Sequence, residues 1–259
     1  MKQVQYATLL GGFVISVLAF GYIFQLPFAT NLWPWADGRL SYLFIGSILA
    51  AVSVAAIWIG WTGELGALPA GALNVFVIAV TCAIFFLQLA VRENRAELFP
   101  YGFASILMAV ASIIAFQWSR KFELTDSRPT PKLVRISFGI FIAALFFAGG
   151  SLVMKLPIFP WALDPKSSVV FGCIFLGDAF YFLYGLFRPR WHNALGQLLS
   201  FLAYDLVLIF PFLALFKTVK PDYQLNLIVY VAVLLYSGAL AAYYLFINAG
   251  TRVWNSNKL

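Results

Sequence analysis

The chain has 259 residues, of which 63% are hydrophobic and 10% are charged, and its formal net charge is +7. Soluble globular domains contain about 25% charged and about 45–50% apolar residues, and no soluble fold of this size has enough interior to hide so much apolar surface. The composition therefore excludes a cytosolic enzyme, a secreted disulfide scaffold, a disordered chain and a free nucleic-acid-binding module. Because the basic residues fall between apolar stretches, we interpret the positive charge as a determinant of membrane orientation.

Eight stretches are long and apolar enough to cross the hydrocarbon core of a bilayer, which takes about 20 residues of helix. Charged residues, prolines or glycines bound each stretch, and none shows the alternating pattern of a membrane β-strand. The stretches are residues 6–26, 40–61, 68–91, 100–118, 136–154, 168–187, 195–216 and 225–248. The sequence therefore predicts an all-α membrane protein with eight transmembrane helices.

The basic residues are divided unevenly between the two sides of this arrangement. Ten fall on the side of the N-terminus and seven on the other, and five of the ten lie in the central loop from Ser119 to Arg135. Short loops rich in Lys and Arg stay in the cytoplasm. We therefore expect an integral protein of a bacterial inner membrane with both termini in the cytoplasm.

The two halves of the sequence resemble each other. At an offset of 126 residues, segment 28–47 aligns with segment 154–173 without a gap, and five of the twenty positions are identical. The same offset places each of the first four spans on one of the last four. We therefore predict two parallel four-helix repeats, residues 1–122 and 136–259, joined by a cytoplasmic linker at residues 123–135.

Each half contains an aromatic segment with a proline just before its second span. Tryptophan favours the headgroup depth of a bilayer, and proline presets the turn into a helix. We interpret these segments as interfacial anchors, and the alternative is an aromatic-lined mouth for a lipid-like ligand. The residues are Trp33, Pro34 and Trp35 in the first half, and Phe159, Pro160 and Trp161 in the second.

Small residues indicate where helices pack closely. Gly46 and Ala50 lie one turn apart in the second span, and Gly172 is the counterpart of Gly46 in the sixth. Small residues at this spacing let two helix backbones approach each other in lipid. Cys82 and Cys173 also fall inside spans, and we interpret them as small packing residues rather than as a disulfide or a metal site.

Two aspartates fall in the middle of predicted spans, Asp178 in the sixth and Asp205 in the seventh. Charge at this depth costs several kcal/mol, so such residues are typical of ion, proton or substrate sites. Each is about ten residues from the start of its span, and a short loop joins the two spans, which places the carboxyls at similar depth. Tyr181, Gln197 and Tyr204 are the polar neighbours that we include in this candidate site.

Three interpretations of the two acids are open at this point. They can form a proton, cation or substrate site, they can join helices through hydrogen bonds of a protonated carboxyl, or they can pair with a cation of a partner subunit. The offset of 126 residues aligns them with Val52 and Ala79, so the first half lacks both acids. Asn74, in the third span, is a further interhelical hydrogen-bonding residue.

No motif of a nucleotide-binding or hydrolytic enzyme is present. His192 is the one histidine, which excludes a bis-histidine haem or a histidine-rich metal centre within this chain. We therefore expect no enzyme activity, no metal and no derivable cofactor, although the 27 phenylalanines can line a site for a lipid, quinone or carotenoid.

The expected partners are the lipid bilayer and, as a further option, other membrane subunits, with no nucleic acid. The leading hypothesis is a small transporter with a proton- or cation-linked acidic site near the midplane. The alternative is a non-catalytic subunit of a larger membrane complex, of the electron-transfer or photosynthetic type, that packs on partner helices or apolar cofactors.

Overall fold

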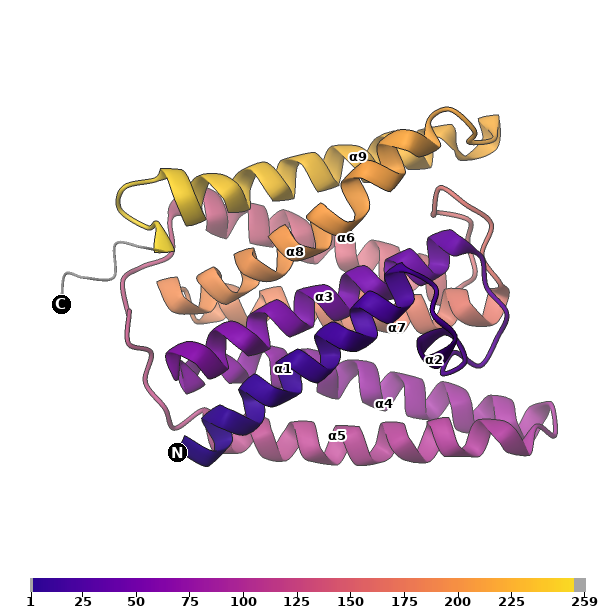
Figure 1. Cartoon of the computed structure of the whole chain (residues 1–259), viewed down its shortest axis with the longest axis horizontal. Helices are drawn as coiled ribbons and strands as arrows, with labels where there is room; N and C mark the ends of the chain where they lie inside the picture. The colour runs from indigo at the N-terminus through magenta and orange to yellow at the C-terminus, as the bar shows by residue number, and fades with distance from the viewer. Residues whose placement is uncertain (1, 254–259) are drawn as a thin grey trace. The chain divides into compact units, whose positions relative to one another are not determined.

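Eight helices in the described part of the chain are long and apolar enough to cross a membrane, as predicted (Figure 1). The computed structural model describes residues 2–253; Met1 and residues 254–259, which include the basic Lys258, are outside the described part. The helices are α1 (Lys2–Ile23), α3 (Arg39–Thr62), α4 (Leu68–Arg92), α5 (Phe99–Ser119), α6 (Lys132–Val153), α7 (Pro165–Phe187), α8 (Trp191–Leu215) and α9 (Pro221–Ala242). The prediction of an all-α membrane protein is confirmed.

Short elements lengthen three of these helices. The 3-10 turns η1 (Leu65–Ala67) and η2 (Ala96–Leu98) precede α4 and α5, and the π-helical turn η3 (Tyr243–Ile247) continues α9. Proline stands in the first turn of α4, α5, α7 and α9, where its missing N–H costs no hydrogen bond. Helix α3 ends at Gly63, whose φ of 76° is the left-handed cap that glycine adopts without strain.

The chain divides into two compact units that differ from the two halves of the sequence. Unit 1 contains α1, the short helix α2 (Pro27–Thr30), α3, the segment Phe159–Ala162, α8 from Ala194 onward, and α9. Unit 2 contains α4, α5, α6 and α7 with the segment between α5 and α6. Each unit thus takes two spans from each predicted repeat, and the repeat itself stays a prediction.

In unit 1, α1 and α3 pack with their backbones in contact. A Cβ atom on Gly60 would lie 2.5 Å from the amide nitrogen of Leu9, and one on Gly46 would lie 3.1 Å from both the oxygen of Ala19 and the nitrogen of Ile23. Only small residues permit such an approach. An apolar core of the same unit joins α3, α8 and α9 through Leu43, Leu208, Phe212, Leu227, Val231 and Leu234.

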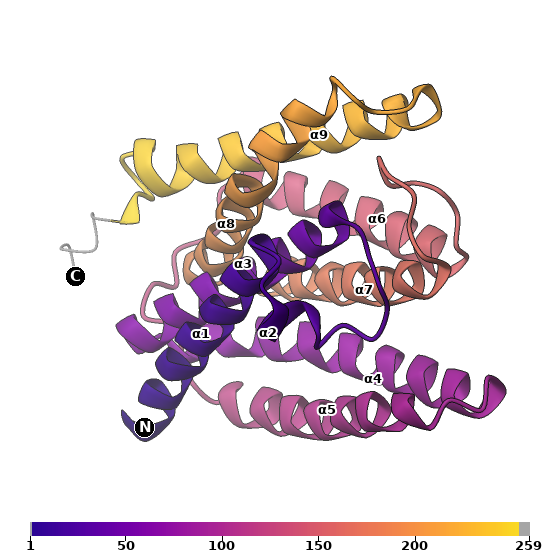
Figure 2. The same cartoon turned by 45° about the vertical axis from the view of Figure 1, so that its right-hand side comes forward.

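In unit 2, α6 packs on α7, and α4 contacts both α5 and α7; α4 and α5 run side by side in both views (Figure 2). A Cβ on Gly172 would lie 2.7 Å from the oxygen of Gly149 and 2.8 Å from the nitrogen of Val153. Gly46 in unit 1 and Gly172 in unit 2 thus make the same type of contact. Each lies against the backbone oxygen of one residue and the backbone nitrogen of the residue four positions later in the neighbouring helix.

The segment that joins α5 to α6 is held against the turn between α7 and α8. The Trp191 N–H donates to the Arg128 oxygen at 2.7 Å, and the Thr130 N–H donates to the Pro189 oxygen at 2.9 Å. The Asp126 N–H donates to His192 Nδ1 at 3.3 Å. The Trp191 ring is 2% exposed. The predicted linker is therefore a packed part of unit 2.

Candidate functional site

Asp178 lies in α7 and accepts a hydrogen bond from the side-chain amide of Asn74 in α4, with 2.8 Å between Nδ2 and Oδ1. The contact is possible because a glycine precedes the acid: a Cβ on Gly177 would lie 2.7 Å from Asn74 Oδ1 and 2.9 Å from its backbone oxygen. Asn74 is 6% exposed, and its Oδ1 has no hydrogen-bond partner among the described residues. Both elements belong to unit 2.

The contact lies well inside the membrane-spanning part of unit 2. Asn74 is nine residues from Leu65, where its span begins, and Asp178 is nine residues from Phe187, where α7 ends. At 1.5 Å per residue each side chain is about 14 Å from that end of its helix. Since a hydrocarbon core is about 30 Å thick, the pair lies near its middle.

Asp205 lies in α8 and accepts a hydrogen bond from the hydroxyl of Ser237 in α9, with 3.0 Å between Oγ and Oδ1. The carboxyl is 4% exposed, and its Oδ2 has no hydrogen-bond partner in the described part of the chain. Gly238 gives this oxygen room, since a Cβ there would lie 3.4 Å from Oδ2. All three residues belong to unit 1, so the two acids occupy different units.

The Ser237 hydroxyl proton has three possible acceptors, Asp205 and the backbone oxygens of Val233 and Leu234, the last at 3.3 Å. Besides Asp205, the backbone oxygen of Val233 lies 2.8 Å from Ser237 Oγ. An ionised Asp205 can accept the hydroxyl proton, whereas a protonated Asp205 can donate to Ser237 Oγ while the hydroxyl turns to Val233. This arrangement can satisfy either protonation state of the acid.

Asn74 offers Asp178 the same choice. Its amide has two donors on Nδ2 and an acceptor, Oδ1. In the described orientation Nδ2 donates to the carboxyl, and a half-turn of the amide would present Oδ1 to a protonated carboxyl instead. Both acids are thus paired with an uncharged group that can donate or accept.

The three polar neighbours named from the sequence lie near the acids along the chain, and each has contacts of its own. The Tyr204 hydroxyl forms a hydrogen bond with that of Tyr230. Tyr181 packs edge-on against Phe182, with 5.5 Å between ring centroids. Gln197 is fully buried in α8. The sequence analysis did not predict the bonds of Asn74 with Asp178 and of Ser237 with Asp205. Asn74 lies nine residues after the start of its span and Asp178 nine residues before the end of α7, and this equal depth could have indicated the first bond.

The two aromatic segments have different surroundings. Trp33, Pro34 and Trp35 are half-buried, and Trp33 Nε1 donates to Asp37 at 2.9 Å. Phe159 and Pro160 are buried in unit 1. Trp161 is half-buried, its Nε1 donates to Ser41 at 3.1 Å, and its ring stacks on Phe159 at 4.6 Å. The second segment therefore packs among α3, α8 and α9, with rings that include Phe44, Phe212 and Tyr230.

The two cysteines are buried, reduced and close to each other in unit 2. Cys82 of α4 and Cys173 of α7 lie within hydrogen-bonding reach. Over residues 2–253, no group of three or more His, Cys, Asp or Glu side chains could hold a metal ion. Ala50 of the predicted packing pair is half-buried in α3.

The fold and these contacts define the chain as a polytopic α-helical membrane protein with two carboxyls among its spanning helices, Asp205 buried and Asp178 half-buried. Comparison with known protein families, with characterised proteins and with solved structures gave no match. The chemistry of the two carboxyls is therefore the basis on which its function is inferred.

Proposed function

We propose that the chain is a small proton-linked transport protein in which Asp178 and Asp205 take up and release protons inside the membrane. The observation that supports this most is the type of partner that each acid has. Asn74 and Ser237 are uncharged, and each can stabilise both the ionised and the protonated carboxyl. A group that only joins helices needs a partner for one state alone.

The distribution of charge supports a change of protonation rather than a permanent ion pair. Along α7 the basic residues nearest Asp178 are Lys166 and Arg188, at the two ends of the helix, and α8 and α9 contain no Lys or Arg. None of the ion pairs found among the described residues includes either acid. An unpaired carboxylate at this depth costs several kcal/mol, so proton uptake is the way in which this chain alone can neutralise it.

A polar stripe on α8 provides a route by which protons can reach Asp205. Gln197 and Ser200 are buried and lie on the same side of the helix as Tyr204, at intervals of three and four residues. The Ser200 hydroxyl also donates to the Ala51 oxygen of α3 at 3.1 Å. The stripe begins near the end of α8 that we place in the cytoplasm, which is where protons would enter or leave.

Proton uptake at Asp205 follows a simple sequence. A proton binds the ionised carboxylate, the new O–H donates to Ser237 Oγ, and the Ser237 hydroxyl turns its own proton to the Val233 oxygen. Release reverses these steps, and no other atom gains or loses a bond. At Asp178 the half-turn of the Asn74 amide has the role of the serine hydroxyl.

Dye-loaded vesicles test this function. Purified protein is reconstituted with a pH-sensitive dye inside, an inward proton gradient is applied, and a panel of amino acids, sugars and organic cations is added outside. We expect a solute that accelerates acidification with the wild type and not with Asp178→Asn or Asp205→Asn, because Asn keeps the size but does not titrate. Asp222→Asn, in the exposed first turn of α9, is the matched control. Full solute-driven influx in both membrane variants would contradict the proposal.

The alternative of a subunit in a larger complex predicts a different result. A cation from a partner helix would then neutralise the acids, so the same Asn substitutions would release that partner. Mass measurement of the protein purified in mild detergent distinguishes the two functions: partners that persist with the wild type and dissociate from the Asn variants would favour the subunit role.

A further inference from the structure

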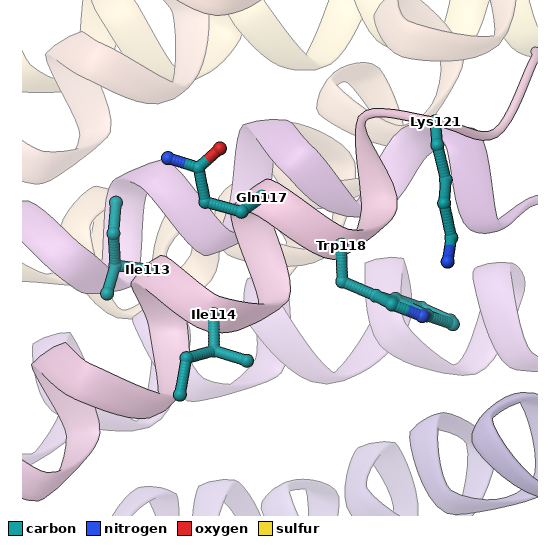
Figure 3. A pocket seen from close by; sticks show the side chains of 5 residues that line it. All are labelled: Ile113, Ile114, Gln117, Trp118 and Lys121. Atoms are coloured by element: carbon teal, nitrogen blue, oxygen red, sulfur yellow. The ribbon is translucent and has the colours of Figure 1, made fainter.

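The last turns of α5 form a shallow hollow on the surface of unit 2. It is lined by Ile113, Ile114, Gln117, Trp118 and Lys121 (Figure 3). Ile114 is 62% exposed, whereas Trp118 is half-buried and Lys121 is exposed. The lining therefore changes from apolar to aromatic to basic in the direction of the helix end.

The cation in this hollow is held by rings rather than by acids. The Lys121 ammonium lies 5.3 Å from the centroid of the Trp118 ring and 5.4 Å from that of Phe122, which is the range of a cation–π contact. Arg120 lies over Phe116 in the same way, at 5.4 Å. Among the described residues neither cation forms an ion pair, so both keep their charge available for an anion.

This end of unit 2 has a large excess of positive charge. Its acids are Glu123 and Asp126, and Asp126 is already paired with Arg128. Its basic residues number seven: Arg120, Lys121, Arg128, Lys132, Arg135, Arg188 and Arg190. Backbone hydrogen bonds between residues 126–130 and 188–192 keep the segments that contain them together.

The other end of unit 2 is nearly neutral. Its four cations, Arg92, Arg95, Lys155 and Lys166, stand beside three acids, Glu93, Glu97 and Asp164. Two ion pairs form among them, Arg95 with Glu97 and Lys166 with Glu93. The excess of cations is therefore far larger at the α5 end than at the other end of unit 2.

We propose that the α5 hollow binds an anionic phospholipid. The isoleucines offer an apolar surface for an acyl chain, and Trp118 lies where its ring suits the interface. Lys121 neutralises the headgroup phosphate, and Arg120, next to it in the chain but outside the lining, adds positive charge nearby. A soluble anion would gain nothing from Ile113 and Ile114, and a zwitterionic lipid would gain less from the two cations. The occupant that matches both parts of the hollow is a lipid with net negative charge.

Native mass spectrometry tests the proposal. Delipidated protein in mild detergent receives either phosphatidylglycerol or phosphatidylcholine with identical acyl chains, and the lipids retained per protein are counted. We expect the wild type to retain phosphatidylglycerol preferentially. Lys121→Gln should lower its affinity about fivefold, since one Lys near an anionic surface contributes about that factor, and should leave phosphatidylcholine retention unchanged.

Lys217→Gln is the matched control, because this lysine is exposed and lies in unit 1 beyond the end of α8. Trp118→Leu is a second variant, which keeps an apolar side chain but loses the ring under Lys121, and it should weaken phosphatidylglycerol retention in the same direction. Equal retention of the two lipids by the wild type would overturn the proposal, as would unchanged phosphatidylglycerol retention in Lys121→Gln.

Discussion

Single hydrogen bonds decide what the two carboxyls within the spanning helices can do. Interhelical hydrogen bonds in membrane proteins contribute about 0.6 kcal/mol on average and up to about 1.7 kcal/mol, which is less than the cost of an unpaired charge at the same depth. Ser237 and Asn74 therefore hold their acids in place only weakly. A bond of this strength can be exchanged between two proton arrangements without loss of the fold.

Asp126, outside the membrane-spanning helices, shows how a paired acid of this chain behaves. Partial burial raises its pKa, but the hydrogen bonds and charge of Arg128 outweigh this effect, so the pKa of Asp126 lies below its ordinary value of 3.8. Arg128 Nε lies 2.9 Å from both carboxylate oxygens. Both residues belong to the α5–α6 segment, and their backbone groups bond to Trp191 and His192 at the start of α8.

We predict that this pair stabilises the protein only while Asp126 is ionised. Since its folded pKa is lowered, the stabilisation is fully present above about pH 4 and is lost as the pH falls through the folded pKa. The melting temperature of the wild type should exceed that of Asp126→Asn at neutral pH and converge with it in acid. The difference corresponds to at most about 1 kcal/mol, because Arg128 is 56% exposed. A difference that is unchanged in strong acid would contradict this account.

At the scale of helices, the closest packing depends on single glycines. Gly172 of α7 contacts the backbone of α6, whereas a Cβ on Gly150 of α6 would meet no atom within 4 Å. Two glycines of one helix pair therefore differ in what an added methyl group would do. Gly46 of α3 has the same type of contact with α1 as Gly172 has with α6.

We predict that Gly172→Ala destabilises the protein and that Gly150→Ala does not. The first places a methyl group against backbone atoms that cannot turn away, and such overpacking costs about 1–3 kcal/mol. The second adds the helix propensity of alanine, about 1 kcal/mol in water, without a clash. Thermal unfolding in detergent measures both variants. A Gly172→Ala variant as stable as Gly150→Ala would show that α6 and α7 are not in backbone contact.

The apolar composition of each stretch and the charged residues, prolines and glycines that bound it were sufficient to predict the helices. They were not sufficient to predict the contacts between helices. All eight spans follow from the length of their apolar stretches, because lipid requires each stretch to satisfy its own backbone. The four-residue helix α2 and the π-turn η3 were missed, since neither has a composition that differs from its surroundings. The partner of Asp178 is 104 residues away in the chain, and such a contact depends on helix rotation, which hydropathy does not determine.

At the scale of the whole molecule, we infer that the two units are equivalent products of the duplication predicted from the sequence. The offset of 126 residues exchanges the spans of unit 1 with those of unit 2, and it places Ser200 on Asn74 and Ala51 on Gly177. Ser200 bonds to α3 at Ala51, just as Asn74 lies against α7 at Gly177. The contact of α8 with α3 in unit 1 and that of α4 with α7 in unit 2 therefore both have a polar residue at the equivalent position.

The ends of α1 and α6 support the same inference. Leu26 N–H donates to the Gly21 oxygen, and Leu156 N–H donates to the Ser151 oxygen, while Gln25 and Lys155 both have positive φ. The residues at the end of α1 and their equivalents at the end of α6 are 130 positions apart, four more than the offset of 126 that aligns the rest of the two halves. The loop that follows α1 is longer than the one that follows α6 by four residues and contains the four-residue helix α2. An insertion of the short helix α2 accounts for the difference, and the ungapped alignment at an offset of 126 then begins at Asn31, not at Phe28.

We also predict that the segment between α5 and α6 is cytoplasmic, because it contains the largest group of basic residues. A reporter active only in the cytoplasm should give signal after Asp126 and none at Ala96, between α4 and α5. The predicted cytoplasmic C-terminus also implies a signal at Leu259, which is outside the described residues. Signal at Ala96 and none after Asp126 would reverse the orientation.

Carbodiimide labelling tests most directly the central claim that Asp178 and Asp205 change protonation. An apolar carbodiimide reacts with protonated carboxyls in a membrane, and mass spectrometry of peptides locates each adduct in the reconstituted protein. We predict adducts at Asp178 and Asp205 that decrease as the pH is raised, no adduct at either position after substitution by Asn, and none at the exposed Asp222. Labelling of both acids that does not change with pH would show that they are permanently protonated and only join helices, and an absence of labelling at every pH would show that they are never protonated; either result would contradict the account.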